Sequence, residues 1–452
     1  MGENRVMATA APREMGIQSV RLTLWVLLIV YVFNFIDRQI VNILAELIAR
    51  DLELSDTQIG LMTGLAFALF YTVLGIPIAR FADRQTTSRP QLIAVALGLW
   101  SAMTALCGLA QNFAQLLLAR IGVGVGEAGC TPPAHSLISD MVPPEKRASA
   151  LAFYSLGIPV GTLLGMIIGG TLADRIGWRE AFVIVGLPGV VLALVVWFVL
   201  KDPRRADAAT VLQARNQPAA LPLRQAIGEV MRSRAYVLLL FAGSAASFLA
   251  YGKTTWTTIF FQRTHDLTPG QTGLWFGLIA GVGGMCGTLL GGYLADRFGA
   301  RNRRHVLSAP AIGMALAVPL AIAAYHAPSW PLALVLLFVP TVFNSFYYGP
   351  CYSAAQGLVP MRARAIAAAA LLFFQNLIGL GLGPLFFGML SDLLQPTYGA
   401  ESVRYVLYGA AVLGLVPAFF FWRCSLHLNA ELDRKDLDPV PAPAAPPSPA
   451  RS

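Results

Sequence analysis

Apolar residues follow one another along this chain in long runs, each interrupted by a short polar stretch. A helix needs roughly 20 mostly apolar residues to cross the hydrocarbon layer of a bilayer. Twelve runs approach or exceed that length: 22–48, 56–79, 91–111, 114–140, 148–172, 180–200, 235–261, 271–295, 305–325, 331–358, 365–390 and 403–423. The pattern predicts an all-α polytopic membrane protein with twelve transmembrane helices.

The composition supports this prediction. Of the 452 residues, 56% are hydrophobic and 13% are charged, whereas soluble domains carry about 25% charged residues. The lipid bilayer is therefore the first partner that the sequence implies.

One polar stretch, 201–234, divides the twelve runs into two sets of six. We therefore predict an N-terminal six-helix bundle at 22–200, a cytoplasmic linker at 201–234 and a C-terminal six-helix bundle at 235–425. Residues 1–21 form a predicted cytoplasmic N-terminus. The segment 426–452 ends in a Pro- and Ala-rich sequence that is typical of a disordered tail.

The formal net charge is +9, but its distribution does not indicate nucleic-acid binding. Lys and Arg gather in alternate loops, which by the positive-inside rule places both termini in the cytoplasm. The chain also has no N-x-[ST] glycosylation sequon. We predict a multi-pass protein of the bacterial inner (plasma) membrane.

The two halves repeat each other in sequence. Leu54–Gly60 matches Leu267–Gly273 at an offset of 213 residues, and Val142-Pro143 matches Val359-Pro360 at an offset of 217. Parallel repeats of this kind are related by a pseudo-two-fold axis, with a substrate site near the midplane between them.

The first run carries charges at its centre. Asp37 and Arg38 lie in the middle of 22–48, where a charged side chain costs roughly 2.5–3.5 kcal/mol even on lenient insertion scales. Adjacent helical residues point about 100° apart, so each needs a partner on another helix or water. The two readings are a functional site and a structural ion pair between helices.

Four motifs resemble the major facilitator superfamily. Residues 79–84 and 292–301 resemble its G-x-L-A-D-R loop, Arg120–Ala128 resembles its R-x-x-x-G motif, and Gly157–Gly161 resembles its antiporter-type glycine-proline motif. The resemblance covers 20–425. It implies two bundles that work by alternating access, and a monomer.

Other stretches resemble the spinster branch of that superfamily. They are Asn34–Arg38, Gly124–Ala128, Pro132-Pro133 and Pro143–Arg147. The resemblance implies export of sphingosine-1-phosphate, lysophospholipids or similar lipids coupled to protons, with the proton as coupling ion and no other cofactor.

Arg120 and Glu127 are seven residues apart and share a helix face. In this superfamily spans one and four line the cavity, so we expect them to converge with Asp37 and Arg38. Burial and a neighbouring acid favour the protonated carboxyl, whereas Arg opposes this. Our hypothesis is that Asp37 and Glu127 bind the coupling proton and Arg120 sets their affinity. Arg38 or Arg120 would bind an anionic head group; the alternative is a static network.

The second half lacks these charges, because the offsets align Asp37 with Ala250 and Glu127 with Asn344. It carries aromatic residues instead, which predicts an apolar wall facing a charged one, as an amphipathic ligand requires. Helix packing or a lipid-facing belt would also explain the aromatics, and Lys253 could instead snorkel to the surface. The predicted substrate contacts in this half are Tyr251, Lys253, Phe343, Tyr347, Tyr348 and Phe374.

Charged residues in and near the signature loops have a different expected role. By the family resemblance they latch the cytoplasmic side shut in the outward-open state. The predicted gating residues are Arg80, Asp83, Arg84, Arg147, Asp296, Arg297 and Arg364.

Rival classes find little support. The sequence has no P-loop, nucleophile elbow or HExxH motif, so we predict neither an enzyme nor a metal site. A receptor that transports nothing would have no use for acidic residues inside the membrane, so we do not favour that class. Two alternatives to lipid export remain open: a proton-coupled organic-anion (sugar-acid-like) symporter and a multidrug exporter.

Overall fold

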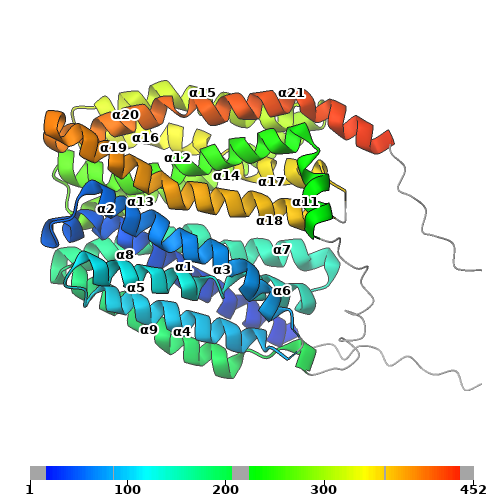
Figure 1. Ribbon diagram of the computed structural model, residues 1–452, viewed down its shortest axis with the longest axis horizontal. Coiled ribbons are helices and arrows are strands. Elements are labelled where there is room, and N and C mark those ends of the chain that lie inside the picture. The colour runs from blue at the N-terminus through cyan, green and yellow to red at the C-terminus, as the bar shows by residue number, and fades with distance from the viewer. Residues whose placement is uncertain (1–16, 85, 206–222, 361–362, 438–452) are drawn as a thin grey trace, which may run out of the picture. The chain divides into compact units, whose positions relative to one another are not determined.

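The computed structural model describes residues 17–84, 86–205, 223–360 and 363–437 (Figure 1). These residues form helices and no strands. Eleven helical stretches are long and apolar enough to cross a membrane, and the last, Ile366–Asp433, has 68 residues and contains two of the predicted spans. The chain turns within it at Gly399, whose φ is +58°. The predicted all-α polytopic fold is confirmed.

The helices of the first half are α1 (Ile17–Asp51), α2 (Asp56–Gly60), the π-helix η1 (Leu61–Leu65), α3 (Ala66–Ala82), α4 (Arg89–Cys107), α5 (Phe113–Glu127), α6 (Thr131–Met141), α7 (Pro144–Ser155), α8 (Gly157–Ile176) and α9 (Trp178–Val199). The short 3-10 helix η2 (Pro203–Arg205) follows.

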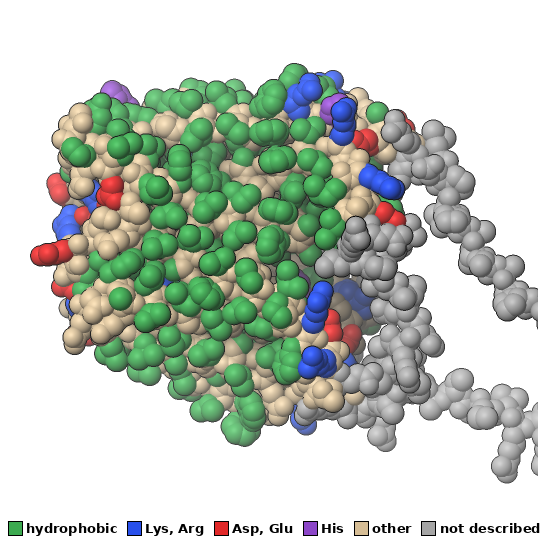
Figure 2. Space-filling model, viewed as in Figure 1, with side chains coloured by type: hydrophobic (Ala, Val, Ile, Leu, Met, Phe, Trp, Pro, Cys, Tyr) green, Lys and Arg blue, Asp and Glu red, His purple; other side chains and the backbone are tan. Residues whose placement is uncertain are grey.

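The helices of the second half are α11 (Leu223–Met231), α12 (Arg234–Thr264), α13 (Pro269–Leu278), the π-helix η3 (Ile279–Gly283), α14 (Gly284–Gly299), α15 (His305–His326), α16 (Trp330–Asn344), α17 (Tyr348–Gly357), α18 (Arg364–Phe374), the π-helix η5 (Gln375–Leu382), α19 (Gly383–Tyr398), the 3-10 helix η6 (Gly399–Glu401), α20 (Ser402–Val412) and α21 (Leu415–Leu437). In Figure 2 hydrophobic side chains cover the sides of the helices, and charged side chains gather near helix ends.

The chain folds into two compact units. One comprises Met1–Leu44 and Leu69–Gln217, and the other comprises Ala45–Ala68 and Pro218–Ser452. The boundary at 217/218 falls inside the predicted linker. The segment 45–68, which belongs to the N-terminal half of the sequence, packs with the second unit, and the sequence pattern gives no sign of this.

Within the first unit, α4 packs against α5 and α9 (Figure 1). Glycines let α8 approach α1 closely, because a Cβ atom at Gly161 would lie 2.5 Å from the Val32 carbonyl oxygen and 2.6 Å from the Phe35 Cβ. Small residues at helix crossings let membrane helices approach closely and gain van der Waals contact.

Within the second unit, α12 packs against α19, α21 and η5 (Figure 1). Helix α21 continues to Leu437, so the prediction of a disordered tail from 426 is wrong for its first part. The extension is held because Glu431 accepts hydrogen bonds from the hydroxyl of Ser233 and, at 2.9 Å, from the amide of Ala235 at the start of α12. The rest of the predicted tail, from 438, lies outside the described residues, as does most of the predicted N-terminus.

The sequence repeat is visible in local structure. Ser55 forms a capping box with Gln58 at the start of α2, and Thr268 forms one with Gln271 at the start of α13. Both boxes satisfy amide groups that a helix start leaves unpaired. Two equivalent residues before them, Glu53 and Asp266, share a φ of +52°. All three pairs of positions have the offset of 213.

The fourth and tenth predicted spans are broken helices, although the sequence predicts each as continuous. Helix α5 ends at Glu127 before α6 begins at Thr131, and α16 ends at Asn344 before α17 begins at Tyr348. The two ends are related by the offset of 217. Interrupted helices at membrane depth occur where the backbone is buried in protein or lines a cavity.

Candidate functional site

An ion pair joins span one, which carries charges at its centre, to span four, which is a broken helix. Both spans contribute their residues within the first unit. The Nε of Arg38 donates to Oε2 of Glu127 at 2.6 Å. The side chain of Arg38 is 10% exposed and that of Glu127 is fully buried. The guanidinium carbon of Arg38 also lies 5.1 Å from the ring centre of Phe35 and 4.5 Å from that of Tyr71. Such cation–π contacts, worth about 2 kcal/mol when desolvated, hold the guanidinium in place.

Asp37 lies beside this pair. It is 1% exposed, and the side chains of Trp100 and Thr104 on α4 lie close enough to stabilise its carboxylate as donors, although neither contact meets strict hydrogen-bond geometry. Electrostatic interactions couple it to Glu127 and Arg120, and Arg120 is itself 1% exposed. The structure therefore brings the four predicted residues of spans one and four into one buried ionic cluster.

Sequence analysis missed polar neighbours of this cluster. Asn34 is fully buried, and its side chain lies close enough to Glu127 to stabilise that carboxylate. The indole nitrogen of Trp100 and the hydroxyl of Thr104, both on α4, are buried and act on Asp37 in the same way. Only Asn34 had a sequence signal, because it opens the polar stretch of span one. Buried polar groups normally satisfy one another, and these three surround the two carboxylates of the cluster.

Of the predicted substrate residues of the second unit, Tyr347 lies near Tyr348 and Tyr251. Tyr347 is buried in the core of that unit, stacks on Tyr348 with ring centres 4.4 Å apart, and lies 3.3 Å from the Ser247 hydroxyl. Phe374, 38% exposed, contacts its neighbour Phe373. The remaining three, Tyr251, Lys253 and Phe343, are half-buried.

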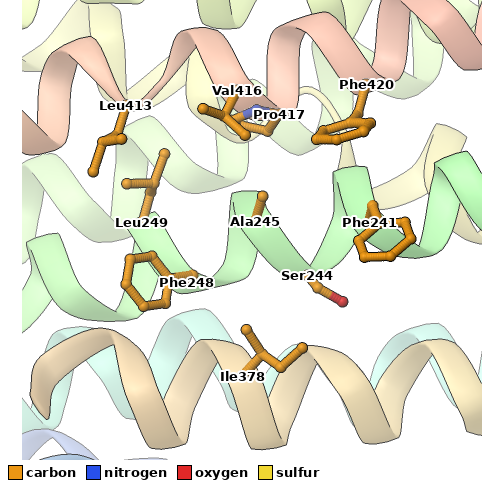
Figure 3. A pocket seen from close by; sticks show the side chains of 10 residues that line it. All are labelled: Phe241, Ser244, Ala245, Phe248, Leu249, Ile378, Leu413, Val416, Pro417 and Phe420. Atoms are coloured by element: carbon orange, nitrogen blue, oxygen red, sulfur yellow. The ribbon is translucent and has the colours of Figure 1, made fainter. Parts of the chain in front are cut away.

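An apolar cavity of about 310 Å³ that opens to the molecular surface lies in the second unit, between α12, η5 and the junction of α20 with α21 (Figure 3). Its lining consists of Phe241, Ser244, Ala245, Phe248, Leu249, Ile378, Leu413, Val416, Pro417 and Phe420. None of the predicted substrate contacts is among them. The one hydroxyl, on Ser244, is buried without a hydrogen-bond partner in the part of the chain described. This lining fits hydrocarbon and offers no charge to a head group.

The predicted gating residues lie at helix ends and in loops. All but Arg147 are exposed. Arg147 donates to the Ser139 carbonyl at 2.7 Å, and Arg297 donates to the Tyr293 hydroxyl at 2.6 Å. Each contact that the structure gives these two residues stays within its own half of the sequence.

A more strongly bonded arginine lies beside the first signature loop. Arg89 is fully buried and makes a bidentate ion pair with Asp202, at 3.1 Å from Nε and 2.7 Å from Nη2. Its Nη1 donates to Asp140 at 2.6 Å and to Ser136 at 2.9 Å. This network ties the start of α4 to α6 and to the segment after α9. Arg89 is not among the gating residues predicted from the sequence.

The network also fixes the ionisation of Asp202. Burial acts to raise the pKa of this carboxyl, but hydrogen bonds from Arg89 and Arg204 outweigh burial and hold the pKa well below its usual range. A carboxyl with a lowered folded-state pKa stabilises the fold above its unfolded pKa, near 3.9, and loses that contribution as the pH falls toward the folded value.

We expect Asp202→Asn to flatten the acid dependence of stability. The wild-type protein should lose thermal stability between about pH 5 and pH 3, and the variant should lose less over the same window. Unfolding temperatures in mild detergent at several pH values would measure this. Glu145→Gln, which changes an exposed carboxylate, is the control. Equal slopes for wild type and Asp202→Asn would contradict the prediction.

Comparison with known proteins agrees with the fold. The sequence profile of the Major Facilitator Superfamily matches residues 27–384 and 285–450. An MFS-type efflux pump of Mycolicibacterium smegmatis is 35% identical over 408 residues, covering 90% of this chain and 93% of that protein. A probable L-galactonate transporter of Escherichia coli is 27% identical and covers 59% of each protein.

Among solved structures, a bacterial homologue of the human lysosomal transporter spinster, in an inward-facing and unoccupied conformation, superposes with a TM-score of 0.82. It is 31% identical and covers 91% of this chain and 98% of that one. The two-unit, all-helical fold with a buried ionic cluster is that of a membrane transporter. The chain belongs to the Major Facilitator Superfamily, and within it to the spinster-like transporters.

Proposed function

We propose that this protein exports single-chain amphipathic lipids, such as sphingosine-1-phosphate or lysophospholipids, by proton-coupled alternating access. The observation that carries the proposal is the buried Arg38–Glu127 ion pair beside Asp37, a second carboxylate that is 1% exposed. Two neighbouring carboxylates in a low-dielectric interior are costly unless both charges are fully compensated. Taking up a proton removes that cost, which makes Asp37 and Glu127 the proposed proton sites.

Head-group binding falls to the basic residues. The guanidinium groups of Arg38 and Arg120 can bind phosphate oxygens in a bidentate manner once a carboxylate partner is neutralised. Lys253, in α12, is half-buried and has no ion pair with a carboxylate among the described residues. A cation left without a counter-charge inside a membrane span supports an anionic ligand.

The apolar part of the ligand suits the second unit, where the aromatic residues predicted from the sequence and the lining of the 310 Å³ cavity offer hydrocarbon surface. The proposal places the protein in a bacterial inner membrane as a monomer with both termini cytoplasmic. In that topology the predicted gating residues lie at the cytoplasmic mouth.

Two other cargoes have specific support. A sugar acid would fit the same arginines through its carboxylate, and one relative is named as a probable L-galactonate transporter. A multidrug substrate is supported by the relative named as an efflux pump. The transport mechanism is the same in all three cases, and the cargo differs.

The test is flux in proteoliposomes that contain purified protein. Labelled sphingosine-1-phosphate, lysophosphatidylcholine and galactonate are supplied separately, with and without a pH gradient. We expect lipid flux that the gradient accelerates. Galactonate flux without lipid flux would replace the lipid proposal by the organic-anion alternative, and lipid flux that ignores the gradient would refute proton coupling.

A further inference from the structure

A second buried ionic cluster lies far along the helices from the linker, within the second unit. Arg263, near the end of α12, bonds to residues of the N-terminal half of the sequence. Its Nη2 donates to Oε2 of Glu46 at 2.6 Å, and its Nη1 and Nη2 each donate to one oxygen of Asp56 at 3.0 Å. The three side chains are 13%, 6% and 4% exposed.

A fourth residue closes the cluster from α19. The two carboxylate oxygens of Asp392 accept hydrogen bonds from the backbone amides of Asp56 and Thr57, at 2.9 and 2.8 Å. They thereby cap the start of α2, where a carboxylate is also favoured by the helix dipole. The neighbouring Ser391 hydroxyl donates to Asp56 at 2.6 Å. We name Glu46, Asp56, Arg263 and Asp392 the outer clasp.

Close backbone packing accompanies these bonds. A Cβ atom at Gly388 would lie 2.3 Å from the carbonyl oxygen of Asp56, and one at Gly60 would lie 2.4 Å from that of Pro384. The indole of Trp256 donates to the same Pro384 carbonyl at 2.9 Å. Helices α2 and α19 therefore meet without intervening side chains, and only a separation of backbones can open this contact.

The sequence repeat shows that this arrangement is specific to one half. Arg50 is the equivalent of Arg263 at the offset of 213. Its side chain is 62% exposed, and its ion pair, 3.0 Å from Nε to Oε1 of Glu46, lies within its own helix. An exposed pair four residues apart contributes little to stability. The two arginines carry the same charge near the same carboxylate, but only Arg263 joins different helices.

We infer that the outer clasp is the gate on the non-cytoplasmic side and that Arg263 is its closing residue. This inference rests on the proposed alternating-access function. The clasp holds 45–68, the end of span one and the start of span two, against spans seven and eleven. Opening that side requires these ends to part, so Arg263 must release both carboxylates. Without Arg263, Glu46 and Asp56 would be left as buried like charges, which disfavours the closed state.

The test measures solvent access to one buried position. Thr63, in η1, is 4% exposed, and Thr63→Cys is placed in a background in which the five native cysteines are replaced. Labelling by a membrane-impermeant maleimide reports opening and needs no substrate. We expect Arg263→Gln to raise the labelling rate on the order of tenfold or more, since hydrogen bonds to charged groups contribute about 1.5–3 kcal/mol each.

Arg50→Gln is the matched control and should leave the rate unchanged. Gly388→Ala provides an independent route, because its methyl group opposes closure without altering charge, and it should raise labelling as well. If Arg263→Gln and Gly388→Ala, both shown to be folded by gel filtration, label no faster than the parent, the clasp is not a gate. Increased labelling in a protein that shows no lipid flux would support the gate and refute only the proposed cargo.

Discussion

Replacing Glu127 by Gln is expected to reduce gradient-driven flux by on the order of 100-fold. The change keeps the shape of the side chain but removes a proton site and the charge that pairs with Arg38 at 2.6 Å. Arg38 would then lie beside a neutral amide. The Glu127 carboxylate, which we propose both takes up the proton and releases Arg38 for ligand binding, would be missing. Flux of labelled lysophospholipid in proteoliposomes, measured across a range of pH gradients, gives the result.

The matched control is Glu145→Gln, which removes an exposed carboxylate from α7 of the same unit and should leave flux unchanged. Asp37→Asn should resemble Glu127→Gln, because the two carboxylates are electrostatically coupled. Retention of the full pH dependence by Asp37→Asn would show that Asp37 does not carry the proton. If Glu127→Gln also kept the full pH dependence, the Arg38–Glu127 ion pair would have a structural role only.

The largest effect on stability is expected from Arg89→Met. This change leaves the Asp202 carboxylate, which is 1% exposed, without its bidentate partner. Removing one member of a buried ion pair typically costs 3–5 kcal/mol because the other charge stays buried. The variant should unfold at a clearly lower temperature in detergent than the wild-type protein.

Arg84→Met is the control for Arg89→Met, since Arg84 is exposed and the contact that the structure gives its side chain is with the ring of the nearby Phe81, at the end of α3. The double variant Arg89→Met, Asp202→Asn should recover part of the loss, because it no longer buries a carboxylate that only Arg204 still pairs with. If Arg89→Met lowered the free energy of unfolding by less than about 1 kcal/mol, the Arg89 network would contribute no more than an exposed surface ion pair does.

Much of the fold could be predicted from the sequence because its causes are local. A run of apolar residues determines a membrane span by itself, as the positions of the predicted spans show. The capping residues Ser55 and Thr268 likewise act within one helical turn. The helix break at Glu127, by contrast, depends on how a glycine- and proline-rich stretch packs against other helices. A hydropathy average over that stretch does not show the break.

The ionic cluster could be predicted in part. Asp37, Arg38, Arg120 and Glu127 carry charges where the membrane penalises them, so their positions are visible in one sequence. Tyr71, which holds Arg38 by a cation–π contact, could not be found in this way, because an aromatic residue in an apolar span carries no such signal. The six predicted substrate contacts of the second half could not be assigned from the sequence either, because their side chains suit helix packing, lipid contact and ligand binding equally.

The sequence by itself determined the class of the protein: a twelve-span helical repeat with acids and bases inside the membrane. Only the tertiary structure decided which charges meet. It joined Arg38 to Glu127, Arg89 to Asp202, and Arg263 to Glu46 and Asp56, across separations of 89, 113, 217 and 207 residues. Hydropathy and capping act over a few residues, whereas an ion pair depends on how distant helices pack, and no local pattern encodes that.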